Sequence, residues 1–309
     1  MSSKPGQILD KTLVFVTAPS NLGLKRMPYA DKDGPGTRKM PGVFKQFLFA
    51  ERLKIAAHIH IEPPAYSGKV DAETGIRNLP EILSYSKQYA AVIKSIVEKD
   101  QLPIVIGGDC SILVGSMLAL KQSGTYGLAH IDGHSDYAIA KISSSTGGVA
   151  GMDLAIVTGI GPDAITNIDN LKPYVAEANT AQFANRCYDE TFNGNFYNTN
   201  IFSADLPELR ANGIEETANA FIAKLRKNKV DGLWLHVDAD VLNEELMPAV
   251  DSPQEDGLSY AELKTLLKAL LRSGLVCGFQ LTIYDPDLDP GKVYGKKLVD
   301  ELVDLFQQA

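Results

Sequence analysis

The chain has 309 residues, of which 45% are hydrophobic and 22% are charged, so it is long enough to bury a large core. The formal net charge is -8 at pH 7, and no block of like charge stands out. An acidic chain is a poor partner for nucleic acid, although it can accept a small cationic substrate. We therefore expect no nucleic-acid partner, and the charge is compatible with a small-molecule substrate.

Cysteine content and the N-terminal sequence predict a cytoplasmic protein. Three cysteines, Cys110, Cys187 and Cys277, are too few for a disulfide framework, which favours a reducing compartment. Residues 1–11 are polar and lack the apolar stretch of a signal peptide. No apolar run approaches the roughly 18 residues that a membrane span needs, so we expect no membrane partner.

Short apolar runs, many of them β-branched, recur along the chain and predict buried strands. Continuous apolar runs of this length are typical of strands that are covered on both faces of a parallel sheet. The runs are residues 12–17, 57–61, 103–106, 126–131, 154–157, 200–203, 233–237 and 276–284.

Helical patterns lie between several of these strands. Residues 80–99 repeat apolar side chains at helical spacing, and residues 111–121 are apolar almost all round, as in a buried helix. Strand–helix alternation predicts an α/β fold, a three-layer sandwich with a mostly parallel sheet of roughly eight strands, as one domain over residues 1–309. The other helical patterns are 216–227, 260–271 with Ser259 as N-cap, and 293–307.

Two further stretches are predicted loops. Residues 20–41 are rich in Gly, Pro and charge, and residues 185–198 are rich in Asn and aromatic side chains. In an open parallel sheet, loops of this kind can form the walls of a site at the carboxyl ends of the strands.

Two predicted strands run directly into alternating polar side chains. Because residues two apart in an extended segment point to the same side, each strand end can direct its polar side chains to one place. The sequence therefore predicts a cluster of four carboxylates and one imidazole. Residues 126–131 lead into Asp132, His134 and Asp136, and residues 233–237 lead into Asp238 and Asp240.

This cluster is a donor set for divalent metal ions. Carboxylates within a few ångströms of one another cannot all stay ionised unless cations balance them. Oxygen donors with an imidazole suit Mn, Fe, Co, Ni or Zn, and two bridged ions lower the pKa of a shared water. The alternative is that these residues only cap turns and helices. That explanation fits a single Asp-x-Asp better than two motifs that each follow an apolar strand.

A third motif, Gly-Gly-Asp-Cys-Ser at residues 107–111, lies between a predicted strand and a helix. Its glycines allow a tight turn, but it is a weak phosphate loop because an acid follows them and no Lys-Ser or Lys-Thr comes after. Cys110 would lie at a helix N-terminus, which favours the thiolate and makes it a candidate metal ligand. A small buried thiol is the equal alternative.

His130 and His236 lie inside apolar strands, two residues before Asp132 and Asp238. The same-face spacing makes each histidine a candidate hydrogen-bond donor to a ligand carboxylate. We favour the alternative that both are core histidines whose partners are backbone groups.

The three motifs, in this order, resemble those of the arginase–agmatinase–formiminoglutamase (ureohydrolase) family. The resemblance covers residues 100–290 by motif. Gly-Gly-Asp-His-Ser of the family is similar to residues 107–111, and Asp-Ala-His-x-Asp is similar to residues 132–136. The family's Asp-x-Asp, with a Pro and a Gly after it, is similar to Asp238, Asp240, Pro248 and Gly257.

This resemblance implies a particular chemistry. It implies two Mn-type ions with Asp132 and Asp238 as bridging ligands that generate a hydroxide. That hydroxide would attack a guanidinium or amidine carbon and release urea or formamide. It also implies a homo-oligomer, because members are often trimers or hexamers.

Three residues depart from the family pattern. Cys110 stands where the family has its first metal-binding histidine, and Ala150 stands where a His-Gly pair supplies a proton-transfer histidine. Ile283 stands where members that act on guanidines have a glutamate, which counts against arginine or agmatine as the substrate. Asp153 and Tyr137 are candidates for a replacement acid.

The sequence thus predicts a metal-dependent hydrolase of a linear C–N bond (amidine, guanidine or amide), and not arginase or agmatinase itself. One alternative is a catalytically silent protein with a binding or assembly role. The other is a mononuclear, deacetylase-like amidohydrolase in which Asp132, His134 and Asp240 hold one zinc ion. The predicted metal ligands are Asp132, His134, Asp136, Asp238, Asp240 and, as a candidate, Cys110.

Overall fold

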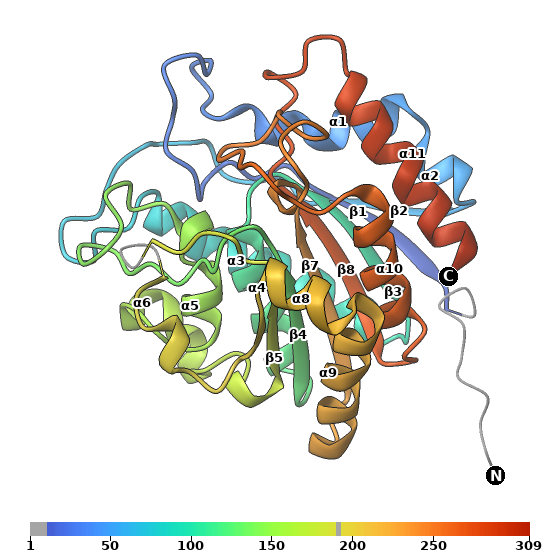
Figure 1. Cartoon of the computed structure of the whole chain (residues 1–309). Helices are drawn as coiled ribbons and strands as arrows, with labels where there is room; N and C mark the ends of the chain where they lie inside the picture. Colours follow the sequence, from blue (N-terminus) through green and yellow to red (C-terminus); the bar gives the residue numbers. More distant parts are fainter. Residues whose placement is uncertain (1–10, 190–192) are drawn as a thin grey trace.

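An eight-stranded sheet forms the centre of the protein (Figure 1). The computed structural model describes residues 11–189 and 193–309. The strand order is β2-β1-β3-β8-β7-β4-β5-β6, and each neighbouring pair is parallel. The strands are β1 (Leu13–Ala18), β2 (Ala57–His60), β3 (Leu102–Gly107), β4 (Tyr126–Ile131), β5 (Thr180–Phe183), β6 (Phe202–Ala204), β7 (Gly232–Asp238) and β8 (Val276–Thr282).

Helices cover both faces of the sheet and complete three layers (Figure 1). One outer layer contains α3 (Leu79–Val97), α4 (Ile112–Lys121), α5 (Asp153–Val157) and α6 (Asp163–Thr166). The other contains α1 (Met40–Gln46), α2 (Phe49–Arg52), α8 (Leu206–Asn212), α9 (Ile214–Asn228), α10 (Tyr260–Leu271) and α11 (Val293–Gln308). Short 3-10 turns are η2 (Gly36–Lys39), η3 (Val149–Gly151), η4 (Ile168–Asn170), η5 (Glu177–Asn179), η6 (Phe196–Asn198) and η7 (Ala239–Val241).

The strands have apolar side chains on both faces because each face packs against a helical layer. In β1, Val14 and Val16 belong to the core beside α3 and α4, whereas Phe15 belongs to the core beside α11. All residues of β3, β7 and β8 are buried. This double burial explains the continuous apolar runs in the sequence.

The structure confirms the predicted α/β fold class and parallel sheet. The helices α3, α4, α9 and α11 lie within two residues of their predicted bounds, and α10 has the predicted ones. Ser259 caps α10 in a capping box, in which its hydroxyl accepts from Glu262 N and the Glu262 carboxylate accepts from Ser259 N. One domain over residues 1–309 stays a prediction.

One predicted strand was wrong, one strand was missed and one was shifted. Residues 154–157, predicted as a strand, belong to the buried helix α5, because a short continuous apolar run does not distinguish a buried strand from a buried helix. The strand β5 was missed because Gln182 interrupts its apolar character. The predicted strand 200–203 is shifted to β6.

Candidate metal centre

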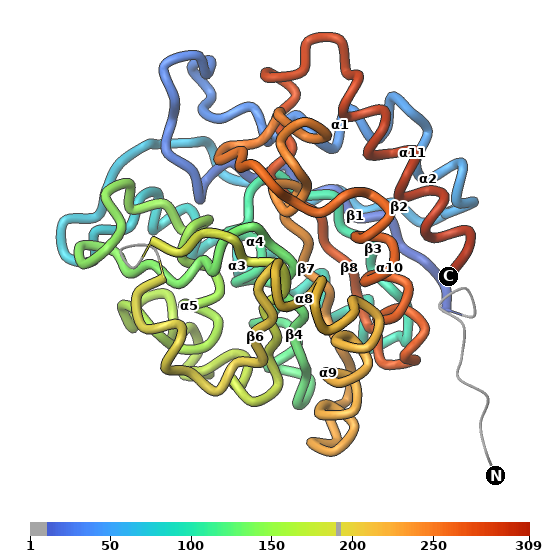
Figure 2. Tube along the Cα trace, viewed as in Figure 1, coloured from blue at the N-terminus to red at the C-terminus, as the bar shows by residue number. Residues whose placement is uncertain are grey.

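The candidate site lies where the neighbouring central strands β4 and β7 end. These strands pair in parallel with His130 opposite His236 and Ile131 opposite Val237. The register therefore brings Asp132, which follows β4, next to Asp238, which ends β7. Figure 2 shows the orange segment after β7 curling over the ends of the strands. The structure therefore brings the two motifs together, as the sequence predicted.

Asp132, His134 and Asp240 form the outer part of this cluster. His134 Nδ1 lies 3.0 Å from Asp240 Oδ2 and 3.7 Å from Asp132 Oδ1. Backbone hydrogen bonds fix the carboxylates of Asp132 and Asp238, because His134 N donates to Asp132 Oδ1 at 2.7 Å and Asp240 N donates to Asp238 Oδ1 at 2.7 Å. One ligand atom from each of these three residues lies within 4.8 Å of the others, so the group could hold one ion.

Cys110 reaches the same cluster from the turn between β3 and α4. Asp109 stabilises this turn by accepting hydrogen bonds from Ser20 Oγ, Gly23 N and Ser111 N. The thiol of Cys110 lies 2.9 Å from Asp238 Oδ2 and is fully buried. Cys110, Asp132 and Asp238 form a second group that could hold an ion. The structure thus places Cys110 beside the carboxylates, which is the position that a metal ligand would need.

A row of polar side chains crosses the buried sheet just below the carboxylates. Gln182, His130, His236 and Gln280 stand in register on β5, β4, β7 and β8, and all four are fully buried. Their side chains point toward the layer of α3, α4 and α5, where burial of unpaired polar groups is costly.

Asp153, the first residue of α5, faces the two histidines of this row. Its Oδ1 lies 3.2 Å from His130 Nε2, and its Oδ2 lies 3.6 Å from His236 Nε2. The other ring nitrogen of His236, Nδ1, lies 2.8 Å from the Gln280 amide. The expected backbone partners of the histidines were therefore wrong. The alternative donor role is not formed either, because His130 Nε2 lies 3.7 Å from Asp132 Oδ2.

Asp136 completes the cluster on the side of Asp153. Its Oδ2 lies 4.0 Å from His130 Nε2, and its backbone has φ 45°, which is uncommon outside glycine. Asp136, His130 and Asp153 form a further group that could hold an ion. All predicted metal ligands are therefore brought together in one region.

The carboxylates of the cluster repel one another, and added positive charge would stabilise them. Burial, followed by repulsion from Asp132 and Asp153, raises the pKa of Asp136 well above its usual value. Burial, then repulsion from Asp240 and Asp132, likewise raises the pKa of Asp238. Although burial opposes it, the hydrogen bond from His134 lowers the pKa of Asp132. Divalent cations would relieve this mutual repulsion.

The donor atoms fit such cations. Asp132 Oδ2 is buried and has no hydrogen-bond partner within residues 11–189 and 193–309. An orphaned buried oxygen of this kind is costly unless it has a cation or water as partner. Together with an imidazole and further carboxylates, it makes a set of oxygen and nitrogen ligands suited to transition-metal ions.

A cavity of about 440 Å³ opens above these residues. Its floor includes His134, Asp136, Asp238 and Asp240, and its walls come from the predicted loops 20–41 and 185–198, the second of which lies partly outside the described residues. The predicted wall role of these loops is confirmed at Leu24, Lys25, Met27, Cys187 and Asn193. A cavity of this size accommodates a small molecule.

Two of the residues that differ from the family pattern lie at this cavity. Ala150 and Ile283 both line it. Ile283 is 3% exposed and has φ 77°, an outlying conformation for a β-branched residue. Asp153 is not among the residues that line the cavity, so a proton-transfer role for it would have to act through a neighbour such as His130. Tyr137 contacts Thr158 instead.

Arg186 has a structural role that the sequence did not reveal. Its guanidinium donates to the carbonyl oxygens of Asp240 at 2.7 Å and Glu255 at 3.1 Å, and it joins the loop after β5 to the segment after β7. A Cβ atom on Gly133 would lie 2.3 Å from Arg186 Nη1, so Gly133 leaves room for this contact. Because all these acceptors are backbone atoms, no sequence motif could have indicated them.

A parallel sheet with carboxylates and a histidine after two central strands is typical of α/β proteins that bind divalent metal ions at the carboxyl edge of the sheet. A sequence model described as "Arginase family" matches residues 28–303. The chain belongs to the arginase family, as the motif resemblance predicted.

Relatives and solved structures agree with this membership. The chain is 26% identical to arginase of Bacillus subtilis (strain 168) over 301 residues, covering 94% of this chain and 96% of the relative. It superposes on arginase from Bacillus caldovelox with a TM-score of 0.84 at 23% identity, covering 96% and 98% of the two chains. Formimidoylglutamase from Bacillus subtilis superposes with a TM-score of 0.69 at 17% identity, covering 96% and 86%.

Family membership sets the coarse function. Members of the arginase family are hydrolases that act on small molecules and have a binuclear metal site. Among the helices within the described ranges, none has both the length and the apolar character that crossing a bilayer requires.

Proposed function

We propose that this protein is a metal-dependent hydrolase that cleaves a linear C–N bond of an amidine, guanidine or amide in a small molecule. The observation that carries the proposal is the convergence of His134, Asp238 and Asp240 on the floor of the cavity, with the buried Asp132 beside His134 and Asp240. Two Mn ions are our first assignment, and Ni, Fe, Co and Zn also suit the donors. We place the protein in the cytoplasm as a homo-oligomer, by analogy with the family.

The residues divide between two ion positions. Asp132, His134 and Asp240 would hold one ion, and Asp132, Asp238 and Cys110 would hold the other, with Asp136 beside it. Asp132 belongs to both groups, and the resemblance to the family implies that Asp132 and Asp238 would each serve both ions. When bound, two such ions would supply Lewis acidity and lower the pKa of a water at the floor of the cavity.

The walls of the cavity would orient the substrate. Ile283 presents an apolar surface where a guanidinium would need a carboxylate, and this argues for a substrate group other than a free guanidinium. Lys25 and Asp251 line the same cavity and supply one charge of each sign. A small molecule with separate charged groups and an amide or amidine fits this lining.

A mononuclear hydrolase is a second candidate. The group Asp132, His134 and Asp240 is compact without any help from Cys110, which favours one firmly held ion. In that protein the Cys110 thiol would keep its contact with Thr282 Oγ1, at 3.0 Å, in place of a metal bond.

Metal-dependent turnover tests the proposal. We would treat the protein with a chelator, reload it with Mn, Ni, Co or Zn, and screen amidines, guanidines and amides for release of ammonia, formamide or urea. We expect hydrolysis of at least one compound class after reloading and none before it, while Asp132→Ala should not regain activity. A metal-saturated protein that hydrolyses nothing in the screen would contradict the proposal and favour a binding or assembly role.

A further inference from the structure

We propose that Cys110, Asp153 and His236 form an inner site for a divalent ion of the zinc class, beneath the outer carboxylate cluster. This assignment moves Cys110 from the second outer position to the inner one, and Asp132, Asp238 and Asp136 would then hold the second outer ion. One ligand atom from each of the three residues lies within 4.8 Å of the other two.

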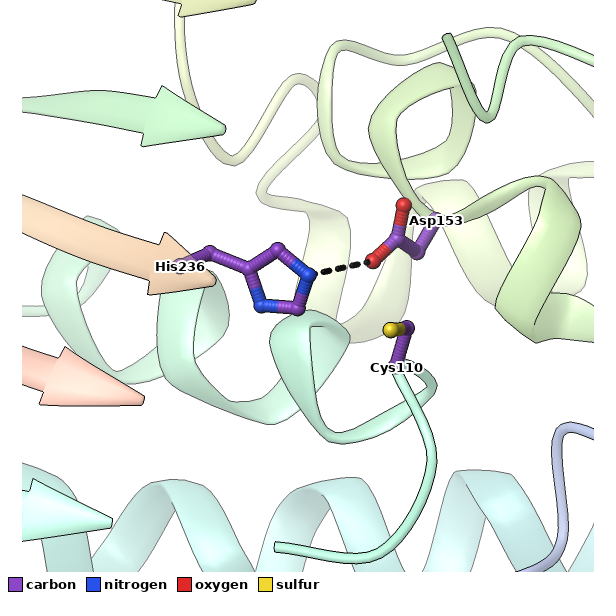
Figure 3. Close-up of side chains that lie close together, drawn as sticks. All are labelled: Cys110, Asp153 and His236. Carbon is purple, nitrogen blue, oxygen red and sulfur yellow. Dashed lines mark ion pairs between the residues drawn. The ribbon is translucent and has the colours of Figure 1, made fainter. Parts of the chain in front are cut away.

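The three ligands come from different elements and converge from different directions. Cys110 belongs to the turn before α4, Asp153 begins α5, and His236 lies in the middle of β7. Figure 3 shows the imidazole and the carboxylate facing each other, with the thiol beside them. All three side chains are fully buried, so packing from three elements fixes their positions.

The spacing of the His236 and Asp153 donor atoms suits a tetrahedral ion. His236 Nε2 and Asp153 Oδ2 lie 3.6 Å apart, which is too long for a hydrogen bond. Zinc bonds to nitrogen, oxygen and sulfur of about 2.0–2.3 Å place neighbouring ligand atoms about 3.3–3.6 Å apart in a tetrahedral site. The distance between the imidazole nitrogen and the carboxylate oxygen is thus the distance expected if both atoms bound one ion.

Two of these donor atoms have no other partner. Asp153 Oδ2 and His236 Nε2 are buried and make no hydrogen bond to any residue that the structure describes. Native proteins rarely leave buried polar atoms without a partner, so each atom requires an explanation. A shared ion satisfies both atoms at once.

The partner on the far side of the His236 ring is an amide side chain. His236 Nδ1 lies 2.8 Å from the Gln280 amide, and Gln280 in turn contacts Ser116 Oγ at 2.7 Å. Metal-bound histidines usually donate their other N–H to such a group. In the structure Gln280 Nε2 faces His236 Nδ1 and Gln280 Oε1 accepts from Ser116 Oγ. An ion on His236 Nε2 requires the Gln280 amide to turn over, so that its oxygen accepts from the Nδ1–H.

The charge of the region leaves room for an inner cation. Five carboxylates, those of Asp132, Asp136, Asp153, Asp238 and Asp240, and the thiol of Cys110 lie close together. Two divalent ions carry four positive charges, one fewer than the number of these carboxylates. A thiolate, an imidazole and a carboxylate make a softer ligand set than the outer oxygens, which favours zinc at this position.

Cobalt spectroscopy with elemental analysis tests the inner site. Cobalt(II) bound to a thiolate gives a sulfur-to-metal charge-transfer absorption that oxygen and nitrogen ligands do not give. We would load the chelator-treated wild type, Cys110→Ser, Asp153→Asn and His236→Ala with Co²⁺ and count the bound ions. We expect the absorption in the wild type, its absence in Cys110→Ser and His236→Ala, and one ion fewer per chain in His236→Ala and Asp153→Asn.

Two control variants separate the inner site from the outer one. Asp240→Ala removes an outer ligand and should lose an outer ion while it keeps the thiolate absorption. His58→Ala removes a histidine of β2, the strand at the far edge of the sheet, and this variant should keep every ion. Asp153→Asn and Cys110→Ser keep the size and polarity of the side chain, so they remain informative if His236→Ala does not fold.

Either of two results would overturn the inner site. If the absorption persists in His236→Ala with an unchanged ion count, Cys110 binds only an outer ion. If the wild type shows no thiolate absorption at full metal loading, Cys110 is not a ligand. Failure of the proposed hydrolase would instead show as missing turnover with the inner ion still bound.

Discussion

His130 and His236 lie opposite each other on the neighbouring strands β4 and β7, with stacked rings whose centroids are 4.9 Å apart at an interplanar angle of 22°. Asp153, at the start of α5, contacts the His130 ring and faces the His236 ring. Two imidazoles and a carboxylate in the middle of a sheet are expensive to bury, so a stable core alone does not account for them. The pair links the outer carboxylates to the buried layer beneath.

Replacement of Asp238 should abolish metal binding at the outer positions. Asp238 ends β7, lies beside Cys110 and orients Asp240 through the Asp240 N–H. We expect Asp238→Ala to lose the outer ions in elemental analysis and to lose all hydrolytic activity. Asp163→Ala, at an exposed aspartate paired with Lys172, is the matched control. Stoichiometric outer metal in Asp238→Ala would disprove the assignment of these ligands.

The stability of the metal-free protein should depend on the ionisation of Asp153. Burial, the largest cause, raises the pKa of Asp153 from 3.8 to about 6 in the folded state. The folded protein then holds this proton more tightly than the unfolded chain, so Asp153 lowers the free energy of unfolding as the pH rises from 4 to above 6. One pKa unit corresponds to about 1.4 kcal/mol, which limits the loss to about 3 kcal/mol.

The variant Asp153→Asn separates this effect from the titration of His236. Burial lowers the pKa of His236 well below its usual value, which has the opposite pH dependence near pH 6. Both proteins contain His236, so its contribution cancels in the difference between them. We expect urea unfolding of the chelated proteins to show Asp153→Asn gaining stability over the wild type between pH 4 and 7. A constant difference across this range would contradict the prediction.

Replacement of Arg186 by lysine should destabilise the protein even though the charge is kept. The guanidinium reaches carbonyls of Asp240 and Glu255 with different nitrogens, and a single ammonium cannot span both segments. Hydrogen bonds to charged groups contribute about 1.5–3 kcal/mol each, so we expect Arg186→Lys to lose about 2 kcal/mol in urea unfolding. The surface arginine variant Arg52→Lys should change stability far less.

Replacement of Ile283 by glutamate should improve turnover of guanidines. Ile283 lines the cavity, and a carboxylate there could pair with a guanidinium over the ion positions. We expect Ile283→Glu to raise kcat/KM for guanidine compounds at least tenfold over the wild type, because a charge-assisted hydrogen bond contributes about 1.5–3 kcal/mol. Ile283→Gln has the same shape without the charge, and an equal gain in that variant would argue against charge pairing.

The sequence indicated that the residues of the outer cluster lie together because its information is local. Asp132 and Asp238 each follow an apolar strand, and parallel strands place their carboxyl ends along one edge of a sheet. Whether β4 and β7 are neighbours did not have to be known for the motifs to suggest a shared site. The ligand types alone then indicated the class of ion.

The inner group could not be predicted in the same way. His130 meets His236 only through the register of two strands, and Asp153 meets both only because residues 153–157 form a helix and not a strand. The wrong strand at residues 154–157 removed the one element that brings Asp153 to the histidines. The contact between Gln280 and His236 likewise depends on the pairing of β8 with β7.

The position of Asp132 and Asp238 has a consequence for the motions of the protein. The two residues are on the order of a hundred positions apart in the chain, and an ion between them would act as a reversible tether that closes a long loop. Removal of the ions should therefore speed amide hydrogen exchange first in the segments that follow β4 and β7. The strands β1 and β2, at the far edge of the sheet, have no such tether and should exchange at the same rate with or without metal.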